Sequence, residues 1–117
     1  FGNLIEYGKL WRLGANEATE IEFFQPVKIR NYKLKKGRYT IYAIPDSSKW
    51  TIILNRETDI WGSFKYDKLK DIMRVDVPAE KMPVTEEYLS MYFEKTTTGF
   101  ALQVTWDDVK ISLPISL

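Results

Sequence analysis

The chain has 117 residues, a formal net charge of +1, a hydrophobic fraction of 44% and a charged fraction of 28%, which predicts one globular domain spanning residues 1–117. It contains no histidine and no cysteine, so histidine triads, histidine bases, thiol catalysis, disulfides and zinc fingers are excluded. The small net charge gives no overall field to recruit nucleic acid, and no apolar run approaches the ~20 residues of a membrane span. We therefore expect no cofactor, no nucleic-acid partner and no membrane span.

The segment 8–24 combines turn-forming glycines with a high density of polar groups. Trp11, Arg12, Asn16 and Glu17 all lie within it. Glycine and asparagine permit the backbone conformations of tight turns, so we predict a loop at one end of the fold. Loops on a rigid scaffold often carry binding groups, which makes these four residues candidate ligand contacts. The alternative is structural: an Arg12–Glu17 ion pair, loop hydrogen bonds from Asn16, and Trp11 closing the end of the core.

Short strands joined by tight turns are predicted over the next part of the chain. Ile21 and Phe23 alternate with two glutamates, which is the period-two pattern of a half-buried strand. Two further short strands follow at 27–29 and 32–34, with tight turns at 30–31 and 35–37. Connections of this length are typical of antiparallel hairpins.

Longer strands occupy the middle of the sequence. Residues 38–44, RYTIYAI, are uncharged on both faces after Arg38, which predicts a central strand covered on both sides. Residues 50–55 form the next predicted strand, and 56–70 are predicted to be a long loop with one short strand or turn around 60–66. In 71–77 the alternation returns, with Met73, Val75 and Val77 inward and Arg74 and Asp76 on the opposite face.

The last third of the chain is predicted to hold three strands. We expect a connector at 78–83, a strand at 84–95 with Leu89, Met91 and Phe93 inward, a turn at 96–99, a strand at 100–106, a turn at Asp107-Asp108 and a final strand at 109–115. No segment of useful length has a helical period. Short strands at intervals of about 8–12 residues predict a single all-β antiparallel β-sandwich of about seven to nine strands with almost no helix.

Carboxylates are the remaining route to acid–base catalysis, since a chain without histidine would need a pair of them. Glu17 is the best candidate for a catalytic residue, with Asp59, Asp67 or Asp71 as its partner. The alternative, which we favour, is that Glu17 pairs with Arg12 and Asp71 with Arg74, because most carboxylates are surface or paired groups. Neither 46–48 nor 107–108 has the spacing of a dedicated calcium loop, so no metal site is predicted.

Aromatic side chains form a second class of candidate ligand contacts, because exposed rings can stack on sugars. The tryptophans and tyrosines available for this are Trp11, Trp61, Tyr42, Tyr88 and Tyr92. Trp50 and Trp106 instead fall on apolar faces of predicted strands, so we assign them to the core.

Three motifs of this chain resemble those of a bacterial family catalogued as domain of unknown function 2911: YGKLWRLGANEATEIEF, WTIILN and WGSFKYD. The resemblance covers nearly the whole chain. It implies an exported protein of the periplasm or cell envelope, but no reaction, cofactor or catalytic residue. Because family members usually continue upstream, and the sequence begins at Phe1, we expect the targeting segment to have been removed and an N-terminal edge strand to be missing.

Taken together, these patterns favour a non-catalytic, exported binding or interaction domain whose ligand is a glycan or a peptide. The candidate contacts are Trp11, Arg12, Asn16, Glu17 and Trp61. Two alternatives stay open: a carboxylate-dependent hydrolase acting on an envelope polysaccharide, and a purely structural envelope domain. The sequence leaves the oligomeric state open.

Overall fold

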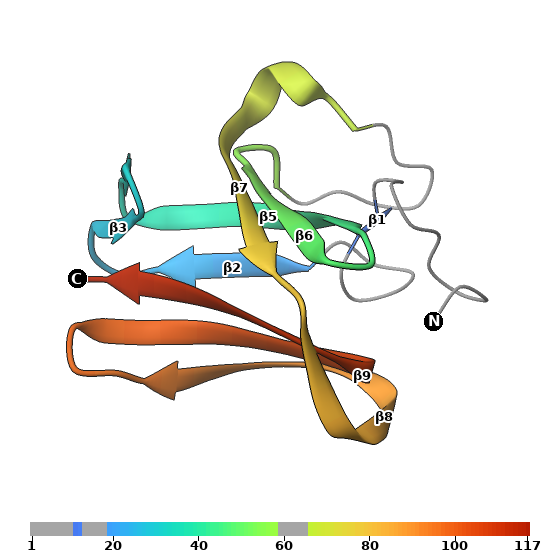
Figure 1. The fold of residues 1–117 in the computed structure, drawn as a ribbon. Helices are drawn as coiled ribbons and strands as arrows, with labels where there is room; N and C mark the ends of the chain where they lie inside the picture. Colours follow the sequence, from blue (N-terminus) through green and yellow to red (C-terminus); the bar gives the residue numbers. More distant parts are fainter. Residues whose placement is uncertain (1–10, 13–18, 59–65) are drawn as a thin grey trace.

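A computed structural model of the chain describes residues 11–12, 19–58 and 66–117, with side chains given for all of these except 11, 12 and 86–88. They form nine strands in two antiparallel sheets that pack as a sandwich (Figure 1), which confirms the predicted fold. The elements are β1 (Trp11–Arg12), β2 (Glu20–Phe23), β3 (Val27–Ile29), β4 (Tyr32–Leu34), β5 (Gly37–Pro45), β6 (Lys49–Asn55), the 3-10 turn η1 (Lys68–Lys70), β7 (Asp71–Pro78), β8 (Glu80–Lys95) and β9 (Gly99–Ser116). Within the described residues, no helix is long and apolar enough to cross a membrane.

The first sheet is centred on β5, which pairs with β6 along one side and with both β1 and β2 along the other; β7 follows β6. Strand β2 runs antiparallel to β5 from Glu20 opposite Thr40 to Phe23 opposite Gly37. Both faces of β5 are covered, because Ile41 on one face and Tyr42 on the other are each 1% exposed. The predicted central strand, covered on both sides, is therefore confirmed.

The second sheet has the order β4-β3-β9-β8. Strand β9 folds back on itself near Asp107, whose φ is 55°; in Figure 1 the bend lies at the right, and the second half of the strand returns to the left towards the C-terminus. The Leu117 amide, just beyond the end of β9, donates a hydrogen bond of 3.3 Å to the carbonyl of Thr98, just before its start. The turn predicted at Asp107-Asp108 is thus present within this element.

One hydrophobic core fills the space between the two sheets. Alternate residues of each strand supply it, as expected for a sandwich whose strands have one inward face. The inward residues of the first sheet include Tyr39, Ile41, Ala43, Trp50, Ile52, Leu54, Met73, Val75 and Val77, and β9 adds Leu102, Val104, Val109, Ile111, Leu113 and Ile115. Trp50 is a core residue, as predicted, whereas Trp106 is only half-buried.

The connector predicted at 78–83 is wrong. Only Ala79 separates β7 from β8, so the chain passes from one sheet to the other almost without a break. The Ala79 amide donates a 3.0 Å hydrogen bond to the carbonyl of Ser48, which fixes this crossing point. Pro83 lies within β8, the outermost strand of its sheet, and an edge strand tolerates a residue without an N–H. Pro78, which ends β7, and Pro83 are therefore both compatible with strands, although the sequence predicted a connector at these positions.

The two lateral sides of the sandwich differ. On one side the edge strands β4 and β7 are joined, because the Tyr32 hydroxyl donates a 3.3 Å hydrogen bond to the carbonyl of Arg74. On the other side the edge of the first sheet is formed by β1 and β2 and the edge of the second sheet by β8, and within the described part of the chain β2 and β8 each pair with one neighbour only. This second side is where the sandwich is hollowed.

A substitution at Gly99, at the start of β9, tests how closely the first half of this strand approaches the second half. A Cβ at Gly99 would overlap the carbonyl oxygen of Ile115, which is backbone and has no freedom to rotate away. We expect Gly99→Ala to lower the free energy of unfolding by about 1–3 kcal/mol, the usual cost of overpacking, and the Tm by several degrees. Thermal unfolding followed by circular dichroism measures both. Thr97→Ala, an exposed position in the same turn, is the control and should melt like the wild type; an unchanged Tm for Gly99→Ala would contradict the close approach.

Candidate functional site

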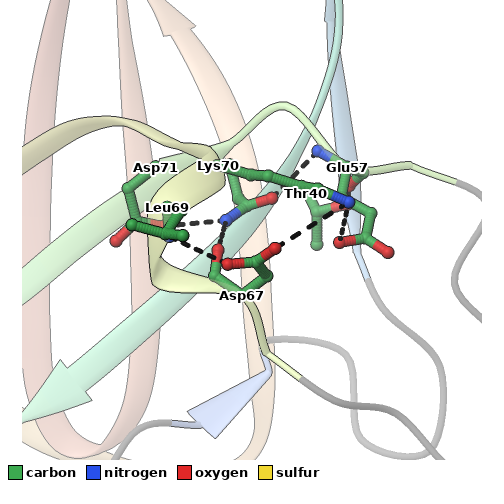
Figure 2. Close-up of polar contacts among 7 residues, drawn as sticks. Thr40, Glu57, Asp67, Leu69, Lys70 and Asp71 are labelled. Atoms are coloured by element: carbon green, nitrogen blue, oxygen red, sulfur yellow. Dashed lines mark hydrogen bonds and ion pairs between the residues drawn. The ribbon is translucent and has the colours of Figure 1, made fainter.

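A group of hydrogen-bonded polar side chains covers the outer face of the first sheet, away from the core. We call it the outer polar cluster, and its members are Thr40, Asn55, Glu57, Tyr66, Asp67, Lys70, Asp71 and Arg74. It joins β5, β6 and β7 to the segments that flank η1, and part of it is seen in Figure 2.

Asn55 is the centre of the outer polar cluster and is 1% exposed. Its side-chain amide donates to a carboxylate oxygen of Asp71 and to the carbonyl of Asp67, both at 2.9 Å. Its side-chain oxygen accepts a 2.9 Å hydrogen bond from the amide of Glu57. Asparagine carries both donors and an acceptor, so this one residue satisfies three groups that come from separate parts of the chain.

The turn η1 is fastened to the sheet through the same cluster (Figure 2). The Asp67 carboxylate caps η1 by accepting a 3.0 Å hydrogen bond from the amide of Leu69. The Lys70 ammonium lies 3.2 Å from a carboxylate oxygen of Glu57 and 3.9 Å from one of Asp67. The hydroxyl of Thr40, which is fully buried, donates a 2.5 Å hydrogen bond to the carbonyl of Glu57. These contacts link η1 to Glu57, and Glu57 to β5.

Asp71 binds three side chains of the cluster. One carboxylate oxygen accepts from Asn55, while the other accepts from the Tyr66 hydroxyl and lies 3.4 Å from the Arg74 guanidinium. The predicted Asp71–Arg74 pair is therefore confirmed. The Tyr66 ring packs edge-on against Tyr42, with centroids 5.0 Å apart. Burial, and then the hydrogen bond and charge of Asp71, raise the pKa of Tyr66 to about 12.

The chemistry of the outer polar cluster is that of a scaffold. Both oxygens of Asp71 are already hydrogen-bonded, and Asp67 is occupied by a cap and an ion pair, so neither is a free base aimed at a substrate. Within the described residues, no group of three or more acidic side chains gathers where a metal ion could be held. Buried polar groups that satisfy one another in this way usually stabilise a fold.

The second candidate is a hollow on the open side of the sandwich. It has a volume of about 380 Å³ and is lined by Glu22, Phe23, Phe24, Gln25, Val27, Phe93, Phe100, Ile115 and Leu117. Three of its aromatic residues are exposed: Phe24 at 83%, Phe93 at 53% and Phe100 at 39%. Phe93 and Phe100 meet edge to face, with centroids 6.5 Å apart.

A second hollow, of about 230 Å³, lies beside the first between β2 and β8. Its lining includes Glu20, Ile21, Glu22, Ile41, Met91, Tyr92, Phe93 and Leu102. Glu22 and Phe93 line both hollows, so we treat the two together as the edge groove. Phe93 is on the inward face, as predicted, but it stays half exposed.

The predicted site residues fall largely outside the described part of the chain. The backbone of Trp11 and Arg12 forms β1, opposite Ala43 and Tyr42 of β5, but their side chains are not described. Asn16, Glu17, Asp59 and Trp61, and the side chain of Tyr88, also lie outside the described residues, so the roles predicted for them stay predictions.

One predicted aromatic contact is wrong. Tyr42 is 1% exposed beneath Tyr66 and has no surface on which a ligand could stack. Sequence reasoning also missed the edge groove, because Phe24, Phe100 and Leu117 were not recognised as contacts. A signal was present at Phe23-Phe24, where two adjacent aromatics interrupt the alternation of β2 and one of them must face outward.

Asn55 provides a direct test of the scaffold role. The side chain of Asn55 is buried and hydrogen-bonds three groups: the amide of Glu57, the carbonyl of Asp67 and one carboxylate oxygen of Asp71. Asn55→Ala removes this shared partner from all three. We expect it to reduce stability by about 1–3 kcal/mol, measured by urea unfolding. Asn31→Ala, at an exposed turn position, is the matched control and should be neutral. Equal stability of the two variants would contradict a structural cluster.

Tyr66 predicts a specific loss of stability at alkaline pH. Its pKa of about 12 in the folded protein lies above the ordinary tyrosine value of 10.0, so between these values the folded state holds a proton that the unfolded state has released. Stability linked to Tyr66 is therefore fully present below pH ~10 and decreases as the pH rises towards 12. Urea unfolding between pH 9.5 and 11.5 should show a shallower decline for Tyr66→Phe than for the wild type. Identical slopes would contradict the raised pKa.

Comparison with known proteins assigns the chain to a family. The family described as "Protein of unknown function (DUF2911)" matches residues 1–115. Searches of curated proteins and of solved structures give no match. The family description names no activity, so the match supports none of the functional hypotheses over the others. Because the match spans nearly the whole chain and agrees with the motifs at its start and middle, the protein belongs to the DUF2911 family.

Proposed function

We propose that this protein is a non-catalytic binding domain that takes an extended, partly apolar peptide in the edge groove. The observation that carries the proposal is the group of exposed aromatic rings in a concave site, with Phe24 83% and Phe93 53% exposed. Contiguous apolar patches on a protein surface commonly mark binding sites. Aromatic residues also dominate the energetics of such contacts.

The lining of the edge groove favours a peptide over a glycan. Sugar sites combine flat aromatic faces with several directed polar groups. In the larger hollow the polar lining residues are Glu22 and Gln25, and the rest of the lining is phenylalanine and aliphatic side chains. Phenylalanine and leucine side chains of a peptide would fill this space and lose contact with water, which is the main favourable term in such association.

The position of the groove favours an extended ligand. It lies between β2 and β8, the edge strands of the two sheets. Edge strands normally carry charges or proline that discourage pairing with other chains, yet residues 89–93 of β8, LSMYF, contain neither. Peptides in extended form bind such edges through main-chain hydrogen bonds, with alternate side chains in pockets.

The alternatives have less support in the described part of the chain. The hydrolase hypothesis depends on Glu17 and Asp59, which are not described, or on Asp67 and Asp71, whose oxygens are engaged in the outer polar cluster. A purely structural role gives no reason for exposed aromatic rings in a groove. As the family resemblance implies, we propose that binding takes place outside the cytoplasm, in the periplasm or cell envelope.

Peptide and glycan arrays probed with the purified chain test this proposal, followed by fluorescence anisotropy with labelled peptides that bind. Phe93→Ser removes a half-exposed ring that lines both hollows and should weaken the affinity for those peptides at least about tenfold, equivalent to ~1.4 kcal/mol. The matched control is Leu69→Ser on η1, where an 88% exposed apolar residue lies outside the edge groove. This control should bind like the wild type.

Three results would overturn the proposal. The first is silence of the whole peptide array, and the second is binding that Phe93→Ser and Leu69→Ser leave equally unchanged. The third is a dimer, detected by analytical ultracentrifugation, that Phe93→Ser dissociates, because the groove would then be filled by a second copy of the chain.

A further inference from the structure

We infer that the peptide adds as a strand to the free edge of β2, and that Glu22 selects a ligand with a basic residue between two apolar ones. This inference rests on the proposed function and names the ligand class for the same groove. It comes from three features of the described residues: the alternation along β2, the ion pairs at the groove, and the side chains shared by the two hollows.

The alternation along β2 sets what an added strand would meet. Ile21 and Phe23 point into the core, while Glu22 is exposed on the opposite face. Strand β2 pairs with β5 along one edge, and no other described strand pairs with it. A peptide bonded to the free edge would place alternate side chains over the hollows, beside Ile21 and Phe23. The side chains between them would lie on the outer face, beside Glu22.

The two carboxylates of β2 differ in their partners. Glu20 is paired with Arg38, with a guanidinium nitrogen and a carboxylate oxygen 3.1 Å apart. Glu22 faces Arg38 in the register of β2 and β5, but its carboxylate makes no hydrogen bond or ion pair with any described residue. An exposed carboxylate without a partner, directly beside an apolar groove, is complementary to a cationic side chain.

Glu22 and Phe93 line both hollows, so they mark the junction between them. An arginine or lysine on the outer face of the added strand would lie beside Glu22, where its charged group can reach the carboxylate. The planar guanidinium of arginine also bonds carboxylates in a bidentate manner. The expected ligand is therefore an extended segment with the pattern apolar–basic–apolar, in which arginine is preferred.

Synthetic nonapeptides test the charge preference. They carry phenylalanine or valine at alternate positions, and the position between two of these is arginine, citrulline or glutamate. Citrulline keeps the shape of arginine without its charge. At low salt we expect arginine to bind about threefold more tightly than citrulline, the range of a cross-strand ion pair, and glutamate to bind most weakly. Glu22→Gln should abolish the difference between arginine and citrulline, and Glu22→Lys should invert the order to favour glutamate.

Two controls isolate the contribution of Glu22. Glu80→Gln removes an exposed carboxylate at the opposite end of β8 from Phe93 and should keep the wild-type order. High salt should reduce the arginine preference, because exposed charges are screened, while leaving the contribution of Phe93 in place.

Backbone methylation tests the addition of a strand. Peptides N-methylated at the positions whose amides face β2 should bind at least about tenfold more weakly, equivalent to ~1.4 kcal/mol, and peptides methylated at the alternating positions should not. Equal tolerance of both sets would overturn strand addition. If the three nonapeptides bind equally well and Phe93→Ser still weakens them, the role of Glu22 is overturned and the peptide-binding function stands. If none binds, the proposed function fails, and this inference fails with it.

Discussion

Strand β5 has to be covered on both faces at once, and the rest of the structure depends on how this is done. Its inward side chains, such as Ile41, pack against the second sheet. Its outward side chains, Thr40 and Tyr42, are as deeply buried although they point away from that core. Buried hydroxyl and backbone groups must find hydrogen-bond partners, so the outer polar cluster is a consequence of the central strand. It supplies a carbonyl to Thr40 and an aromatic cover to Tyr42.

The two sides of the sandwich follow from this arrangement. The outer polar cluster fastens η1, which leads directly into β7, and β7 meets β4 through Tyr32. On the opposite side the four residues of β2 pair with β5 as far as Gly37, where β5 begins. Beside this end of β2, Phe24, Phe93 and Phe100 line the larger hollow. Phe93 and Phe100 are exposed there, so mutation of the two rings should affect binding more than folding.

Much of this fold could be predicted from alternation alone. The inward faces of β5, β6 and β7 follow from period-two patterns, because a shift by one residue would bury charges such as Arg74 and Asp76. The turn at Asp107 follows from two adjacent aspartates between apolar strands. Pattern reasoning failed at Pro83, because whether proline breaks a strand depends on which edge it occupies. It also failed for Tyr42, whose burial depends on Tyr66, a partner distant in sequence. The edge groove was missed for the same reason: its lining residues come from strands that are far apart in the sequence and that only the fold brings together.

An open edge is normally a hazard, because unpaired strands recruit other chains. Natural proteins restrain such edges with charge, and here the charge is placed unevenly. Residues 89–93 of β8 have none, whereas β2 carries glutamates on its outward face. A carboxylate beside an apolar groove repels acidic segments and attracts basic ones. The same residue therefore both protects the open edge from pairing with acidic chains and selects a basic ligand. Specificity of this kind is a difference between partners, and it needs a penalty for the wrong partner as much as an attraction for the right one. In this protein Glu22 is placed to supply both.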